Sequence, residues 1–152
     1  MPGKVPWTNI TYTDAFEYAA RSAIAFGYED CHTALINSFA WDTTIEWLSE
    51  AAENYMSNTR YGNYSGTIYP TGATQTDIIN NICDMAGNVR EWTTEIFRGA
   101  VVTEEREEGV EPALFRVIRG GSASVSRTAR SHTGHAENTS DSYWGFRMIL
   151  YR

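Results

Sequence analysis

The chain has 152 residues, of which 42% are hydrophobic and 20% are charged, so residues 1–152 can bury the core of a single domain. Nineteen acidic residues against twelve basic ones leave a formal net charge of -7, and no Lys/Arg cluster compensates locally. The electrostatic field therefore repels phosphate backbones and argues against a nucleic-acid partner. No apolar run approaches the roughly 20 residues that span a bilayer, so membrane insertion is not expected.

Two helices are predicted in the first third of the chain. Asp14 and Glu17 form a capping box, and Gly27 offers a C-cap. The apolar stripe of this first helix comprises Phe16, Ala19, Ala20, Ala23 and Ile24. Thr43 and Glu46 repeat the start signal for a second helix that runs to about Met56. Its stripe comprises Ile45, Leu48, Ala51, Ala52 and Tyr55.

The remaining segments predict few regular elements. Residues 58–76 are rich in Gly, Tyr, Asn, Ser and Thr and favour a long ordered loop. An acidic run from Glu104 to Glu111, ending at Pro112, is typical of a solvated excursion. Strands are predicted at Phe115–Arg119 and Phe146–Tyr151. The polar segment between them, residues 122–144, has little hydrophobic pattern, and we interpret it as a functional surface.

Eleven of the twelve cations are arginines, which suit planar hydrogen bonding to carboxylates and carbonyls, so several structural arginines are expected. Cys31 and Cys83 form no CxxC motif, and neither a disulfide framework nor a zinc site follows from them. Walker A, GxGxxG, HExxH and GxSxG motifs do not occur, which weakens several large enzyme classes. His132 and His135 allow two interpretations. They are metal ligands in a site completed by Glu137 and Asp141, or they are two solvent-facing polar side chains.

The most specific motif runs from Asp84 to Trp92, with the sequence DMAGNVREW. On its own it is consistent with a pinned loop crossing, in which Asn88 caps a turn, Glu91 pairs with an arginine and Trp92 lies in the core. Together with RVIRGGS at 116–122 and GFR at 145–147, it resembles the formylglycine-generating sulfatase-modifying domain, a branch of the C-type-lectin fold. Residues 6–15 and 40–52 are also similar to the segments that carry the two helices of that family.

The resemblance implies an α+β, C-type-lectin fold: two helices packed on a small twisted antiparallel sheet, with extensive ordered loops. The N-terminal strand region usual in the family is missing, which leaves a short variant and a piece of a larger polypeptide or assembly both open. Catalytic relatives carry a copper-binding cysteine pair shortly after GGS, where this chain has Val125 and Arg130. The histidine-rich iron site of the sulfoxide-synthase relatives has no counterpart either. We therefore expect a chain that is not an enzyme.

The polar segment resembles the variable regions of proteins diversified by retroelements. Of its residues 122–143, only Glu137 cannot be reached by changing the first two bases of an AAC codon. The resemblance implies a receptor-recognition protein of a phage, prophage or cell surface, located on a virion tail or cell surface, whose partner is a protein or glycan on a target cell. A fixed binding or structural domain of the same fold, and a formylglycine-generating-type oxidase, are the alternatives.

Candidate contact residues are the polar or aromatic side chains of this segment: Ser124, Ser126, Arg127, His132, His135, Asn138, Ser140, Ser142 and Tyr143. Scaffold roles are expected for Arg119, Gly120, Gly121, Gly145, Phe146 and Arg147. Arg130 is open between a contact and an arginine buried against a carboxylate. No cofactor is required, although the resemblance implies that Asn88 and Glu91 contribute oxygens to a structural calcium ion.

Overall fold

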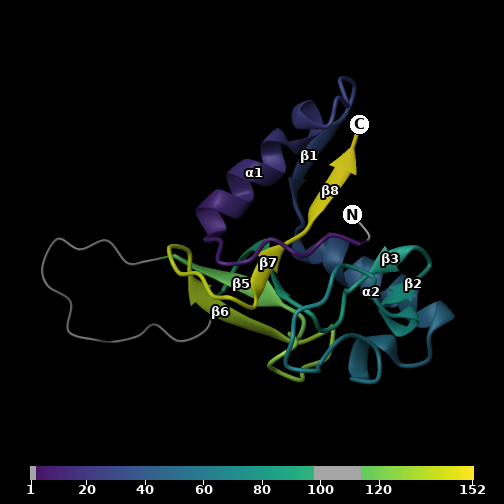
Figure 1. Cartoon of the computed structure of the whole chain (residues 1–152). Coiled ribbons are helices and arrows are strands. Elements are labelled where there is room, and N and C mark those ends of the chain that lie inside the picture. The colour runs from purple at the N-terminus through teal and green to yellow at the C-terminus, as the bar shows by residue number, and fades with distance from the viewer. Residues whose placement is uncertain (1–2, 98–113) are drawn as a thin grey trace, which may run out of the picture.

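The computed structural model describes residues 3–97 and 114–152 (Figure 1). The predicted acidic excursion lies outside the described residues. The described elements, in chain order, are α1 (Tyr12–Ala25), β1 (His32–Leu35), α2 (Ser38–Ala51), η1 (Tyr55–Ser57), η2 (Gln75–Asp77), β2 (Ile78–Ile79), β3 (Ile82–Cys83), β4 (Arg90–Ile96), β5 (Phe115–Arg119), β6 (His132–Ala136), β7 (Trp144–Phe146) and β8 (Met148–Tyr151). No described helix is long and apolar enough to cross a membrane.

The central sheet has four strands in the order β6-β5-β4-β7. The β6–β5 and β5–β4 pairs are antiparallel, whereas β4 and β7 are parallel, so the sheet is mixed rather than wholly antiparallel as predicted. β8 pairs with β1 in a separate two-stranded sheet, beside α1 in Figure 1. The single C-terminal strand predicted for 146–151 is thus divided at Arg147 between two sheets. The α+β class is confirmed.

α1 begins earlier than predicted, because its N-cap is Thr11 and not Asp14. The Thr11 side chain accepts a hydrogen bond of 3.2 Å from the backbone N–H of Asp14. The buried face is also shifted from the predicted stripe: it comprises Tyr12, Ala15, Ala19 and Ala23. Phe16 and Ile24 are exposed, so the sheet packs against small alanines rather than against the larger apolar side chains.

α2 likewise begins before the predicted signal at Thr43. Asn37 is its N-cap, with the side-chain oxygen 2.8 Å from the backbone nitrogen of Ala40. The helix ends at Ala51, and Tyr55 lies in the following turn η1, where it is still buried. The loop predicted at 58–76 contains no helix or strand up to residue 74, and the short 3-10 helix η2 begins inside its last two residues.

Two core clusters lie on the two faces of the central sheet. Trp92 and Ile118 are paired on neighbouring strands and pack against Tyr12 and the alanines of α1. Side chains alternate along a strand, so Arg119 points to the other face, where it pairs with Asp42 of α2. α2 contributes Trp41, Ile45 and Leu48 to the second cluster. The central sheet therefore lies between α1 and α2.

Candidate functional site

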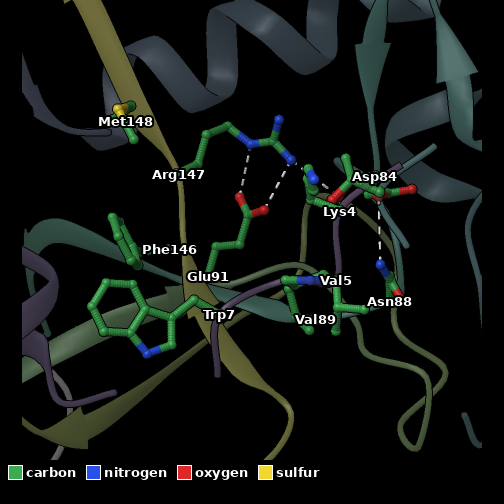
Figure 2. Close-up of a pocket in the computed structure, with 12 residues that line it drawn as sticks. Lys4, Val5, Trp7, Asp84, Asn88, Val89, Glu91, Phe146, Arg147 and Met148 are labelled. Carbon is green, nitrogen blue, oxygen red and sulfur yellow. Dashed lines mark hydrogen bonds and ion pairs between the residues drawn. The ribbon is translucent and has the colours of Figure 1, made fainter. Parts of the chain in front are cut away.

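A cavity of about 400 Å³ lies beside the DMAGNVREW motif (Figure 2). It is lined by the N-terminal segment 4–7, by motif residues and by residues 146–148. Asn88 and Glu91, the predicted calcium ligands, both line this cavity. Whether they can hold a cation depends on what their oxygens already contact.

The carboxylate of Glu91 is committed to Arg147. The two side chains form a bidentate pair, with both nitrogen–oxygen distances at 2.9 Å (Figure 2). Arg147 also donates to the carbonyl oxygen of Cys83 at 2.8 Å. Burial alone would lower the pKa of Arg147, but the Glu91 carboxylate raises it above its ordinary value. The motif's prediction that Glu91 pairs with an arginine is confirmed.

Asn88 is committed to a neighbouring loop. Its side-chain oxygen accepts from the backbone nitrogen of Tyr69 at 3.0 Å and from Asn63 at 3.1 Å, and its nitrogen donates back to the Tyr69 carbonyl. A Cβ on Gly87 would lie 2.6 Å from the Asn63 carbonyl oxygen, so this crossing requires glycine. Asn88 therefore joins the loop at 63–69 to the motif, as a buried amide that is fully hydrogen-bonded.

A calcium ion does not fit these donors, because the Glu91 oxygens face a guanidinium and the Asn88 oxygen faces two N–H groups. Residues 3–97 and 114–152 also contain no group of three or more His, Cys, Asp or Glu side chains arranged to hold a metal ion. That statement covers His132, His135, Glu137 and Asp141, so the metal alternative for the two histidines is not supported.

Asp84 is the unusual acid of this cavity. Burial raises its pKa to about 6, with Asp77 adding to the effect, while a hydrogen bond from the Gly72 backbone and the charge of Arg147 oppose it. The Gly72 nitrogen lies 3.0 Å from the Asp84 carboxylate. Asp84 therefore titrates in a range where most surface carboxylates are already charged.

The polar segment begins with a loop in which buried and exposed residues are interspersed. Ser122, Ala123 and Ala129 are buried, whereas Ser124, Ser126 and Arg127 are exposed. Both ends of the segment meet the same turn: the Tyr64 hydroxyl donates to the Arg127 carbonyl at 2.7 Å, and the Tyr143 hydroxyl donates to the Gly66 carbonyl at 3.1 Å. The exposed serines and Arg127 are therefore held in place by buried neighbours and by hydrogen bonds to this turn.

The segment is not structureless, because β6 lies inside it and pairs with β5 over five positions. Thr133 and His135 share one face of β6, with 3.1 Å between the hydroxyl oxygen and Nε2. The His135 ring lies against Trp144, with 4.2 Å between ring centroids. His132, on the opposite face, lines a second cavity of about 320 Å³ with Arg119 and Arg130.

The remaining predicted contact residues are exposed but spread over different parts of the surface. Asn138 and Ser140 lie in the connection from β6 to β7, beside the chain that enters α1, where the Tyr12 backbone donates to the Glu137 carbonyl. Ser142 is exposed next to the half-buried Tyr143. Arg130 is exposed and forms no ion pair within the described residues, so it is not an arginine buried against a carboxylate. The structure therefore brings together the two ends of the segment rather than all nine residues.

Sequence reasoning missed Arg90. This residue opens β4 and is 7% exposed, yet among the described residues its side chain forms a hydrogen bond only with the Thr133 hydroxyl. Its Nε is buried without a hydrogen-bond partner among the described residues. Burial lowers the pKa of Arg90, and the nearby charge of Arg127 lowers it further. Because Arg90 lies two residues before Trp92, the two share one face of β4, but the sequence did not indicate that strand.

The two thiols lie away from the polar segment. Cys31 lies just before β1, and Cys83, on β3, is buried; both are free. Burial raises the pKa of the Cys83 thiol, which disfavours the reactive thiolate. Val125 and Arg130 occupy the positions where the resemblance would put cysteines.

Comparisons with known proteins bear on this arrangement. The family model of the sulfatase-modifying factor enzyme 1-like domain matches residues 1–151. No curated protein sequence matches the chain. The structure is similar to that of CarF, with a TM-score of 0.69 and 18% identity over 95% of this chain and 66% of CarF. This chain thus spans just under two thirds of CarF.

Two further solved structures share the fold. Treponema denticola variable protein 1 has a TM-score of 0.68 and 15% identity, over 99% of this chain and 72% of that protein. The Major Tropism Determinant U1 variant has a TM-score of 0.54 and 13% identity, over 93% of this chain and 37% of that protein. At identities of 13–18% the likeness shows the fold alone, and it confirms the predicted C-type-lectin fold.

Proposed function

Because the chain belongs to the sulfatase-modifying factor enzyme 1-like family, we propose that it is a non-catalytic, ligand-binding member whose polar segment is diversified by a retroelement. The observation that carries this proposal is the division of residues 122–143 into exposed polar side chains and buried anchors. Ser124, Ser126 and Arg127 are exposed, while Ser122 and Ala129 are each 0% exposed. Such a surface can change its contacts without changing the core.

The composition of the segment supports the same proposal. Short hydroxyl, amide and imidazole side chains provide adaptable hydrogen bonds, and Tyr143 adds contact area at a low entropic cost. Two proteins of the same fold carry the names variable protein and tropism determinant. By analogy, we assign the chain a receptor-recognition role on a virion tail or cell surface, with a protein or glycan of a target cell as the partner.

The residues at the positions of the expected thiols support a non-catalytic role. Neither Val125 nor Arg130 can form a thiolate. Burial raises the pKa of the Cys83 thiol and so disfavours its thiolate form. A formylglycine-generating-type oxidase would need such a pair on the polar segment. A fixed binding or structural domain remains the alternative, because it would use the same surface without variation.

The test is to sequence this gene in many members of its source population. We expect substitutions to concentrate in codons 122–143 and to fall at adenine positions. Within that stretch, Ser124, Ser126 and Arg127 should vary, whereas the buried Ser122, Ala123 and Ala129 should not. The loop at 58–76 is a matched control, since it is similarly rich in Ser, Thr, Gly and Tyr. Equal variation in the two segments would contradict diversification and leave the fixed domain.

A further inference from the structure

Arg90 is a buried cation that the fold leaves without a carboxylate. The described ion pairs give Arg119 both Asp42 and Glu95, and give Arg147 the carboxylate of Glu91. Arg90 is as well buried as Arg119, but within residues 3–97 and 114–152 it forms no ion pair. A buried guanidinium loses its hydration and needs a compensating partner. In the part of the chain that the structure describes, the one hydrogen-bond partner of the Arg90 side chain is the Thr133 hydroxyl.

The surroundings of Arg90 are also positive. Strand alternation puts Arg90 on the same sheet face as Thr133, His135 and Trp144, which lie on the strands β6 and β7 at the two edges. The backbone brings Arg127 toward Arg90: the Arg90 nitrogen donates to the Tyr143 carbonyl at 2.9 Å, and Tyr143 and Arg127 both contact the turn at 64–66. Burial lowers the pKa values of Arg90 and His135, and the charge of Arg127 lowers both further. On a chain whose formal net charge is -7, this is a local concentration of positive charge.

Asp141 is the one acid that acts on both Arg90 and His135, and it raises the pKa of each. Its carboxylate accepts a hydrogen bond from the Tyr143 backbone nitrogen at 2.7 Å and forms no ion pair with Arg90. Thr133 links the other two groups, because its hydroxyl contacts both the Arg90 guanidinium and the His135 ring. The cluster therefore offers several donors, and no described carboxylate forms an ion pair with Arg90.

We propose that Arg90, Arg127 and His135 form a subsite of the polar segment that binds an anionic group, a carboxylate or a phosphate, of the ligand. This inference rests on the proposed ligand-binding function and names the chemistry of its target. A guanidinium suits either group because its planar donors match two oxygens at once. Arg90 belongs to the motif strand, so it would supply a constant charge beneath side chains that vary. Arg127 is exposed and would add a second guanidinium at the surface of the subsite.

The experiment titrates the folded chain with sodium acetate and, separately, with sodium phosphate, at constant ionic strength set with chloride. The readout is the His135 ring resonance in NMR, assigned by its loss in His135→Asn. We expect a saturable shift with one anion or both, and the anion that saturates at lower concentration identifies the chemistry. Arg127→Ser and Arg90→Met should each raise the dissociation constant about tenfold or more, since each removes charge-assisted hydrogen bonds.

Two control variants sharpen the result. Arg21→Ser removes an exposed arginine that pairs with Glu17 on α1, and it should leave the dissociation constant unchanged. Asp141→Asn removes the nearby negative charge and can still accept the Tyr143 hydrogen bond, so it should tighten anion binding. If Arg90→Met does not fold, Arg127→Ser decides the question, because its side chain is exposed.

The inference is overturned if neither anion gives a saturable shift, or if Arg127→Ser binds as the parent does. Either result leaves the diversification test untouched, because gene sequencing does not depend on the charge of the ligand. Conversely, an even pattern of variation would remove diversification while leaving a measured anion site in place.

Discussion

The two sides of strand β4 treat buried charge in opposite ways. On one side, Glu91 is 4% exposed and its carboxylate is paired with Arg147 through two hydrogen bonds. On the other side, the adjacent Arg90 is 7% exposed and has no carboxylate among the described residues. The first arrangement joins β4 to the C-terminal chain, so its charges are structural. The second arrangement leaves the Arg90 guanidinium with donors that a ligand can use.

The variant with the largest expected effect on stability is Glu91→Gln. The substitution keeps the shape of the side chain but leaves the partly buried Arg147 without its counter-charge, so we expect the free energy of unfolding to fall by about 3 kcal/mol. Urea unfolding followed by circular dichroism would measure the loss. Glu17→Gln, which breaks an exposed pair on α1, is the matched control and should change stability by no more than about 0.5 kcal/mol. Similar losses for the two variants would show that the Glu91 pair is not structural.

A second test uses the acid beside that pair. The folded-state pKa of Asp84 is about 6, above its ordinary value of 3.8, so the folded state holds the proton more tightly. Its stabilising contribution is therefore complete below pH of about 4 and is lost as the pH rises through 6, with a total of about 3 kcal/mol. Asp84→Asn should remove this decline and make the chain more stable than the parent at pH 7.

The measurement is the unfolding free energy of both proteins at intervals from pH 4 to pH 7.5. Glu95, whose pKa is lowered by its hydrogen bonds from Ser38 and Arg119 against the effect of burial, contributes the opposite slope in both proteins and cancels in the difference. A difference that stays constant over this range would mean that Asp84 is not shifted upward.

The fold was predictable because its motifs carry long-range contacts in recognisable form. The DMAGNVREW, GGS and GFR segments together indicated the family, and the Glu91–Arg147 pair joins the first of them to the last. Helix boundaries were less predictable, since both Thr11 and Asp14 are suitable caps and Tyr12 is drawn into the helix by its burial and by its contact with Glu137. The choice between them depends on tertiary contacts.

The strands β4 and β6 were missed for a related reason. β4 begins with Arg90 and Glu91, two charged residues that are buried, and no local pattern reveals that burial. β6 contains His132, Thr133, Gly134 and His135, which resemble loop residues until β5 supplies the pairing. The exposed part of the site was accessible from composition, whereas Arg90 became visible only when the absence of a carboxylate around it could be observed.

The smallest expected effect, and the sharpest form of the comparison, is Arg90→Met. A methionine of similar length removes the desolvation cost of an unpaired guanidinium and loses only the contact with the Thr133 hydroxyl, which retains His135 as a partner. We therefore expect the free energy of unfolding to change by less than about 1 kcal/mol, in either direction. The measurement is urea unfolding beside Arg147→Met, which removes an arginine that has its carboxylate and should cost about 3 kcal/mol. A comparable loss for Arg90→Met would make both arginines structural, and the two sides of β4 would then differ only in the kind of partner they use.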